Sequence, residues 1–130
     1  MIQGSCNCGA VRFELTAAPR MMGTCHCSRC RKAGASTFVV VSRDALRWIE
    51  GRADVARYAP EPPFKYMRCF CRHCGTGLGE IDSEAEEIPI AAHCLDDDPE
   101  VRNRFHEWVS AKPAWYEICD GAKQFPEHPG

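Results

Sequence analysis

Hydrophobic and polar residues alternate along several short segments of this chain. Val11, Phe13 and Leu15 are separated by the charged residues Arg12 and Glu14. A period of two is typical of a strand that buries one face. Further strands are predicted at residues 36–44, 46–51, 55–60, 63–71, 87–94 and 105–111. The pattern therefore predicts a mostly β protein whose strands are separated by turns and irregular loops.

Helical signals are weak. Asp98 and Pro99 have residue types preferred at the N-cap and the first position of a helix, so one or two helical turns are predicted within residues 96–105. A second helical turn is predicted just after Cys30. A chain of 130 residues has room for one core, and residues 1–130 are predicted to form a single domain.

Charge and hydropathy count against two classes of partner. The formal net charge is −2 at pH 7, so the molecule offers no basic field that would hold nucleic acid or an anionic membrane. No apolar run approaches the roughly 20 residues that span a bilayer. The start of the chain lacks the basic and apolar regions of a secretory signal. We therefore expect a cytosolic protein that binds neither nucleic acid nor membranes.

The chain contains ten cysteines, a high number for a protein expected in the cytosol. In that reducing compartment, clustered thiols bind metal more often than they form disulfides. Cys6 and Cys8 are separated by one residue, as are Cys25 and Cys27, and a disulfide within either pair would be strained. The cysteines are therefore predicted to bind metal, with disulfides between clusters as the alternative.

Four cysteines form two short chelating pairs that lie far apart in the sequence. The pairs are Cys6-x-Cys8 and Cys71-x-x-Cys74. Two such pairs that converge on one ion make a closed, tetrahedral zinc site with four cysteine ligands. Gly9 and Gly75 follow the pairs and permit the tight turns that such ligands need. The spacing predicts a structural zinc site on which the fold depends.

Three other cysteines form a compact triplet, Cys25-x-Cys27-x-x-Cys30, without an obvious fourth ligand nearby. Three protein ligands and an open position are typical of catalytic zinc, because the vacancy admits water or a substrate thiol. Zinc with three thiolates carries a net negative charge. Arg29, Arg31 and Lys32 could offset that charge, could hold the carboxylates of an anionic substrate, or could form a solvated basic turn.

Five blocks occur in order along the chain: GSCNCGAVRFEL at residues 4–15, GTCHCSRCRKAGASTF at 23–38, RCFCRHCGTGL at 68–78, CLDDDP at 94–99 and KPAWYEICDGAKQF at 112–125. With these blocks the sequence resembles the glutathione-dependent formaldehyde-activating enzyme family, which includes a centromere-protein-V-like branch. The resemblance implies a zinc-stabilised, Mss4-like fold of coiled antiparallel sheets.

The resemblance also implies a set of ligands and a reaction. The structural zinc would be held by Cys6, Cys8, Cys71 and Cys74. The catalytic zinc would be held by Cys25, Cys27 and Cys30. The implied enzyme is a carbon–sulfur lyase that adds the glutathione thiol to formaldehyde, giving S-(hydroxymethyl)glutathione. Its partners would be a small thiol and a small aldehyde.

Two other functions remain open at this point. A non-catalytic zinc module that binds another macromolecule is one, although no basic tail supports it. A zinc store or thiol redox sensor is the other, since a zinc–thiolate group can be oxidised.

The remaining cysteines and histidines have weaker predictions. Cys69, Cys94 and Cys119 are expected to be small buried residues rather than ligands. His26 lies between two predicted ligands and is expected to support the site rather than bind metal. His106 is the preferred general base, should the reaction use one.

Overall fold

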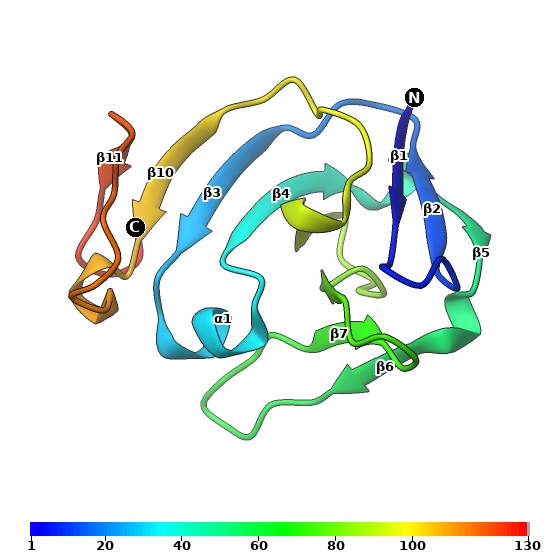
Figure 1. The fold of residues 1–130 in the computed structure, drawn as a ribbon, viewed down its shortest axis with the longest axis horizontal. Coiled ribbons are helices and arrows are strands. Elements are labelled where there is room, and N and C mark those ends of the chain that lie inside the picture. Colours follow the sequence, from blue (N-terminus) through cyan, green and yellow to red (C-terminus); the bar gives the residue numbers. More distant parts are fainter. Residues whose placement is uncertain (130) are drawn as a thin grey trace.

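A computed structural model describes residues 1–129, and within them the alternating segments form strands of two sheets (Figure 1). The strands are β1 (Ile2–Ser5), β2 (Arg12–Leu15), β3 (Met21–Cys25), β4 (Thr37–Ser42), β5 (Leu46–Glu50), β6 (Val55–Tyr58), β7 (Arg68–Cys71), β8 (Gly77–Gly79), β9 (Glu87–Ala91), β10 (Asn103–Glu107) and β11 (Lys123–Gln124). The prediction of a mostly β fold is confirmed.

The smaller sheet has the order β1-β2-β5, and the eight-stranded sheet has the order β11-β10-β3-β4-β9-β8-β7-β6. Most neighbouring strands are antiparallel, but β10 is parallel to both β3 and β11. The parallel pairing brings Cys25, at the end of β3, opposite Glu107, at the end of β10. The larger sheet thus places one end of the triplet next to a strand more than 80 residues away, counting from Cys25 to Glu107.

The described part of the chain has one α-helix, α1 (Ser28–Ala33). It confirms the helical turn predicted after Cys30. Short 3-10 turns occur at Arg43–Ala45, Arg52–Asp54, Ala92–Cys94 and Val109–Ala111. Within residues 1–129, no helix is both long enough and apolar enough to cross a membrane.

The helix predicted within residues 96–105 is wrong. Asp98 accepts a hydrogen bond from the backbone N–H of Glu100 at 2.7 Å, which closes a local turn instead of capping a helix. Glu100 then adopts a positive φ of 60°, which stops a right-handed helix. The carboxylate of Asp96 accepts a hydrogen bond from the hydroxyl of Ser5 on β1. The chain consequently enters strand β10 at Asn103.

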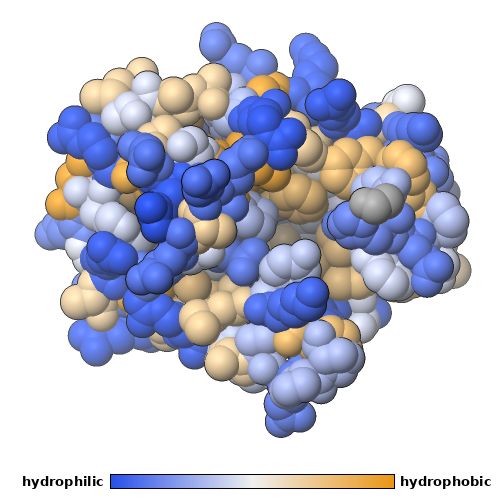
Figure 2. Space-filling view, turned by 180° about the vertical axis from the view of Figure 1, so that it is seen from behind, coloured by the Kyte–Doolittle hydropathy of each residue, from blue (hydrophilic) through white to orange (hydrophobic). Residues whose placement is uncertain are grey.

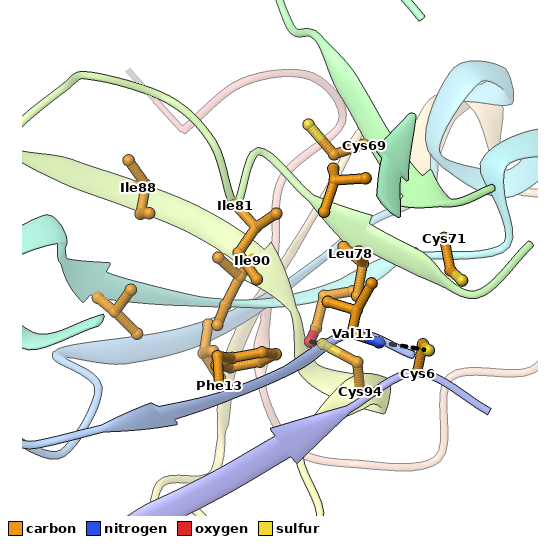
Figure 3. Packing of buried hydrophobic residues seen from close by; sticks show 14 of the residues in the cluster. Cys6, Val11, Phe13, Cys69, Cys71, Leu78, Ile81, Ile88, Ile90 and Cys94 are labelled. Atoms are coloured by element: carbon orange, nitrogen blue, oxygen red, sulfur yellow. Dashed lines mark hydrogen bonds between the residues drawn. The ribbon is translucent and has the colours of Figure 1, made fainter. Parts of the chain in front are cut away.

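The two sheets bury one cluster of apolar side chains between them. Its largest fully buried members are Phe13, Leu15, Leu78, Ile81, Ile88 and Ile90. The alternating residues of β2 contribute Phe13 and Leu15, as their pattern predicted. Cys6 and Cys71 belong to the same cluster and lie together at one side of it (Figure 3). The first pair of cysteines and the second therefore meet where the core ends.

The C-terminal segment, residues 112–129, docks on β10. The backbone N–H of Phe125 donates to the carbonyl of His106 at 2.8 Å. The Phe125 ring contacts that of Phe105, which in turn contacts Phe38 on β4. Figure 2 shows hydrophobic surface gathered beside this segment on a face that is otherwise largely hydrophilic. The docking fixes the position of Asp120, which reaches back toward β10.

Candidate metal centre

The two chelating pairs converge on one point. The ligand sulfurs of Cys6, Cys8, Cys71 and Cys74 all lie within 4.8 Å of one another. Cys6 and Cys8 place their sulfurs 3.6 Å apart, and Cys8 and Cys71 place theirs 3.8 Å apart. A tetrahedron with zinc–sulfur bonds of about 2.3 Å has sulfur–sulfur edges of roughly 3.8 Å, so the donor set fits zinc. All ten cysteines are free of disulfides.

The turns that carry these ligands depend on glycine. Gly9 and Gly75 have φ values of 81° and 78°, a left-handed conformation that costs glycine little. The N–H of Gly9 donates to the carbonyl of Cys6 at 3.0 Å, and that of Gly75 donates to the carbonyl of Cys71 at 2.8 Å. Each turn folds its second cysteine back toward the first, as the spacing predicted.

Thr76 joins the two turns. Its hydroxyl oxygen accepts the N–H of Asn7 at 2.9 Å and lies 3.2 Å from the sulfur of Cys74. The hydrogen bond from this hydroxyl lowers the pKa of the Cys74 thiol to about 5. Cys74 is thus a thiolate at neutral pH, which is the form that binds metal.

The triplet forms a second, smaller group. Cys25 ends β3, Cys27 is the N-cap of α1, and Cys30 lies in the first turn of that helix. Their sulfurs lie within 4.8 Å of one another, and no fourth His, Cys, Asp or Glu of residues 1–129 joins them. The backbone N–H of Cys30 donates to the sulfur of Cys27 at 3.4 Å. The triplet could therefore offer a metal three donors.

The three thiols share their protons unequally. Hydrogen bonds from Cys25 and then from Cys30 hold the pKa of Cys27 far below its usual range. The same contacts, with burial, raise the pKa of Cys25. Cys27 is consequently the thiol of the triplet that loses its proton most readily, and a cation that binds the group can replace the protons of the other two.

Glu107 lies beside the triplet, and sequence reasoning missed it. Its position opposite Cys25 follows from the parallel pairing of β10 with β3. Burial raises the pKa of the Glu107 carboxyl, although hydrogen bonding to Cys25 opposes that shift. Nothing in the alternation of residues 105–111 marks Glu107 as a site residue, because the contact depends on a strand pairing between distant segments.

Arg68 is a second missed residue. One of its terminal nitrogens, Nη2, donates to the sulfur of Cys30 at 3.4 Å. The expected cations are placed differently: Arg29 stacks over Phe64, with 3.9 Å between its guanidinium carbon and the ring centre, and Arg31 is exposed. Arg68 precedes the second chelating pair in the sequence, and its distance from Cys30 is set by the fold.

A buried histidine pair runs from the triplet turn to the C-terminal segment. Nε2 of His26 lies 2.7 Å from Nδ1 of His106, and Nε2 of His106 lies 2.9 Å from a carboxylate oxygen of Asp120. His26 and His106 are 5% and 3% exposed. Tyr116 places the edge of its ring against His26. The supporting role expected for His26 fits this arrangement, and His106 contacts it directly.

Asp120 determines which ring nitrogens carry protons. Hydrogen bonding to His106 lowers the pKa of Asp120, so the carboxylate is charged and accepts the proton on Nε2 of His106. In a neutral His106 ring, Nδ1 then accepts the hydrogen bond and Nε2 of His26 donates it. Burial, and next His106, lower the pKa of His26, so this ring is neutral. Nδ1 of His26 is left as a hydrogen-bond acceptor next to the triplet turn.

The other three cysteines lie outside both groups, as expected. Cys69 is buried, and burial raises its pKa. The thiol of Cys94 donates to the carbonyl of Ala91 at 3.1 Å, and burial raises its pKa to about 12. The expected burial of Cys119 is wrong, because it is exposed on the C-terminal segment.

Comparison with known proteins identifies the family of this chain. The family model for the glutathione-dependent formaldehyde-activating enzyme matches residues 1–111. The chain belongs to this family. A curated protein of Halomonas elongata, named for glutathione-dependent formaldehyde activation, is 33% identical over 129 residues, which cover 91% of this chain and 81% of that protein.

Two further proteins are similar to this chain. An uncharacterized lyase of Schizosaccharomyces pombe is 29% identical over 76 residues, which cover 58% of this chain and 54% of that protein. A crystal structure of a Rhodobacter sphaeroides protein superposes with a TM-score of 0.60 at 27% identity and covers 74% of this chain and 89% of that one. The resemblance stated from the sequence blocks is thus confirmed. Asp120 lies beyond residue 111, where the family match ends.

Proposed function

We propose that this family member is a zinc-dependent carbon–sulfur lyase-type enzyme that acts on a thiol–aldehyde adduct. The adduct we expect is S-(hydroxymethyl)glutathione, formed from glutathione and formaldehyde. The observation that carries the proposal is the triplet of Cys25, Cys27 and Cys30, which supplies three of the four donors of a tetrahedral site. A site with a vacant position is suited to a substrate, whereas the four-cysteine group is closed and suited to architecture. The ten unbridged thiols favour a reducing compartment such as the cytosol.

The donor chemistry fits zinc at both groups, since thiolates are preferred zinc ligands. Zinc held by the triplet would supply a Lewis acid that favours the thiolate form of a bound thiol at neutral pH. The chain's own residues adjust the charge at the triplet. The guanidinium of Arg68 contacts the sulfur of Cys30, and its positive charge partly offsets the negative charge of three thiolates around zinc. An anionic thiolate would therefore meet less repulsion at this site.

The reaction is an addition without net oxidation. The thiol sulfur bonds to the aldehyde carbon, the carbonyl electron pair moves to oxygen, and that oxygen takes up a proton as the thiol loses one. One group that can exchange a proton contacts the triplet, the half-buried carboxyl of Glu107, which hydrogen-bonds to Cys25. The imidazole of His26, the residue between Cys25 and Cys27, is directed to His106. Holding thiol and aldehyde together also removes the entropy cost of a bimolecular encounter.

The proposal predicts that zinc-replete protein accelerates adduct formation. Glutathione and formaldehyde would be mixed with and without the protein, and the rate of S-(hydroxymethyl)glutathione formation measured by exchange NMR. We expect a rate at least tenfold above background at micromolar enzyme, which corresponds to about 1.4 kcal/mol of barrier. Several other thiols should be included. No acceleration with any of them would contradict the proposal and favour a non-catalytic zinc module.

The histidine pair gives a separate prediction. Replacing Asp120 by Asn removes the charge that fixes the proton on His106, so both histidines are expected to populate mixed tautomers. We expect kcat/KM to fall roughly tenfold, the range seen when partners that orient site residues are lost. Imidazole 15N shifts of His26 and His106 would report the tautomers directly. Asp97→Asn is the matched control, because Asp97 binds the N–H of Gln3, away from the triplet. Unchanged 15N shifts in Asp120→Asn would refute the role of the carboxylate.

A further inference from the structure

Arg68 and Glu80 lie opposite each other across two neighbouring strands. Strands β7 and β8 are antiparallel, with Cys69 opposite Gly79. One position further along this register, Arg68 at the start of β7 comes opposite Glu80, just past the end of β8. Residues in such positions project from the same face of a sheet, and opposite charges there attract each other. The two side chains therefore form a cross-strand pair.

The position of Glu80 is fixed by the backbone around it. Its N–H donates to the carbonyl of Pro89 on β9 at 2.9 Å. Gly79 has a φ of 71° and passes so close to β9 that a Cβ there would lie 2.8 Å from a backbone atom of that strand. The half-buried carboxyl of Glu80 is hydrogen-bonded to the backbone of Met67. Glu80 is thus held beside the residue that precedes Arg68.

The carboxylate of Glu80 interacts electrostatically with Arg68. Burial raises the pKa of the Glu80 carboxyl, and the charge of Arg68, followed by the hydrogen bond to Met67, opposes that shift. Arg57, a cation on the other neighbouring strand, β6, is paired with Asp82. No salt bridge within residues 1–129 involves Arg68, so Glu80 acts on it through charge across a half-buried space, where screening is weaker than in water.

Arg68 connects this pair to the triplet. Its Nη2 donates to the sulfur of Cys30 at 3.4 Å, while its Nε is buried without a hydrogen-bond partner in residues 1–129. A single hydrogen bond leaves a guanidinium free to turn, because its orientation is normally fixed by two parallel N–H contacts. The negative charge of Glu80 on the facing strand supplies the second constraint.

We propose that Glu80 is a positioning residue for the triplet, and that its carboxylate keeps the guanidinium of Arg68 against the sulfur of Cys30. The positive charge of Arg68 then offsets part of the negative charge that three thiolates place around a metal. The inference rests on the proposed function only in placing zinc at the triplet. Loss of the Glu80 charge lets Arg68 turn away from Cys30 and weakens the binding of zinc by the triplet.

The test is the isosteric variant Glu80→Gln, whose amide oxygen can still accept the N–H of Met67, so the fold should survive. The zinc affinity of the triplet would be measured by competition with a chelator too weak to empty the four-cysteine group. We expect this affinity to fall about tenfold, the lower end of the range for lost partners of metal ligands. Glu80→Asp keeps the charge and should restore most of the affinity. An unchanged or higher affinity in Glu80→Gln would overturn the inference.

A second background shows whether Glu80 acts through Arg68. When Arg68→Gln is already present, adding Glu80→Gln should change the zinc affinity by less than about twofold, because the carboxylate no longer has a guanidinium to hold. An undiminished loss in that background would contradict the proposal. Glu87→Gln is the matched control, since Glu87 begins β9 and forms an exposed ion pair with Arg20. An equal loss of affinity in this control would show a general effect of charge and would also overturn the inference.

A measurement that needs no zinc separates this inference from the proposed function. The 15N shift of Arg68 Nε reports the surroundings of the guanidinium whether or not the triplet holds a metal. It should move in Glu80→Gln and keep its wild-type value in Glu87→Gln. If the shift moves but the triplet binds no zinc, Glu80 positions Arg68 and the lyase proposal fails. If adduct formation is accelerated but neither the shift nor the zinc affinity depends on Glu80, the lyase proposal stands and the positioning role fails.

Discussion

Replacing Cys71 by serine is expected to unfold the protein at ordinary temperatures. Cys71 is fully buried in the core cluster, and its sulfur lies 3.8 Å from that of Cys8. Zinc bound by structural sites of this kind is worth about 10–16 kcal/mol in small zinc-dependent peptides. The whole free energy of unfolding of a domain is only about 5–15 kcal/mol. Losing one of four ligands removes a large part of that binding and leaves a hydroxyl in an apolar cluster.

Thermal unfolding followed by near-UV circular dichroism would check this expectation. Cys69→Ser is the matched control, because Cys69 lies two residues away on the same strand, is also buried, and belongs to neither cysteine group. We expect this control to cost only about 1–3 kcal/mol, the penalty for burying a poorly paired hydroxyl. A strong zinc chelator should unfold the wild-type protein in the same way as the Cys71 variant. A wild-type melting temperature in Cys71→Ser would show that the fold stands without this group.

The sequence predicted strands where residues alternate and missed those where they do not. β2 was predicted because the apolar Phe13 and Leu15 flank a charged residue in the sequence. In the structure, Phe13 and Leu15 face the core while Arg12 is exposed. β3 was missed because Met21–Cys25 is partly or fully buried along its whole length, which leaves no polar face to give a period of two. β8 has only three residues and two of them are glycine, so it carries no pattern at all.

The two cysteine groups could be predicted because a chelating pair is a local feature. The spacing Cys6-x-Cys8, with a glycine after it, defines a turn whatever the rest of the fold does. Two such turns together supply four donors, which complete a tetrahedral site, whereas the triplet supplies three. This count predicted two separate groups. The structure brings together the residues that the spacing grouped.

The residues around the triplet could not be predicted in the same way. Arg68 contacts Cys30 across 38 residues, and His26 contacts His106 across 80. Each contact depends on which strands pair and in which register, and a single sequence does not contain that information. The cations next to the triplet in the sequence were the natural expectation for charge compensation. In the folded chain, a cation from β7 contacts a triplet sulfur, while Arg29 and Lys32 line a cavity beside α1.

Replacing Cys27 by serine is expected to abolish activity and leave the fold intact. Cys27 is the N-cap of α1, and its sulfur accepts the N–H of Cys30. Serine is among the best N-cap residues, so the helix keeps its cap while the group loses a thiolate. We expect kcat/KM for adduct formation to fall about a thousandfold, or ~4 kcal/mol of transition-state stabilisation. The Tm should change by only a few degrees, since the four-cysteine group and the core are untouched.

Zinc content and rate should be measured together in this variant. The wild-type protein is expected to hold two ions per chain and Cys27→Ser one, because two remaining thiolates bind zinc too weakly to retain it through purification. Cys119→Ser is the control, since it removes an exposed thiol that belongs to neither group and should change neither quantity. If Cys27→Ser keeps two ions and the full rate, the reaction does not use the triplet. If it loses one ion at an unchanged rate, the second metal is dispensable, and the division into a closed site for the fold and an open site for the substrate would have to be abandoned.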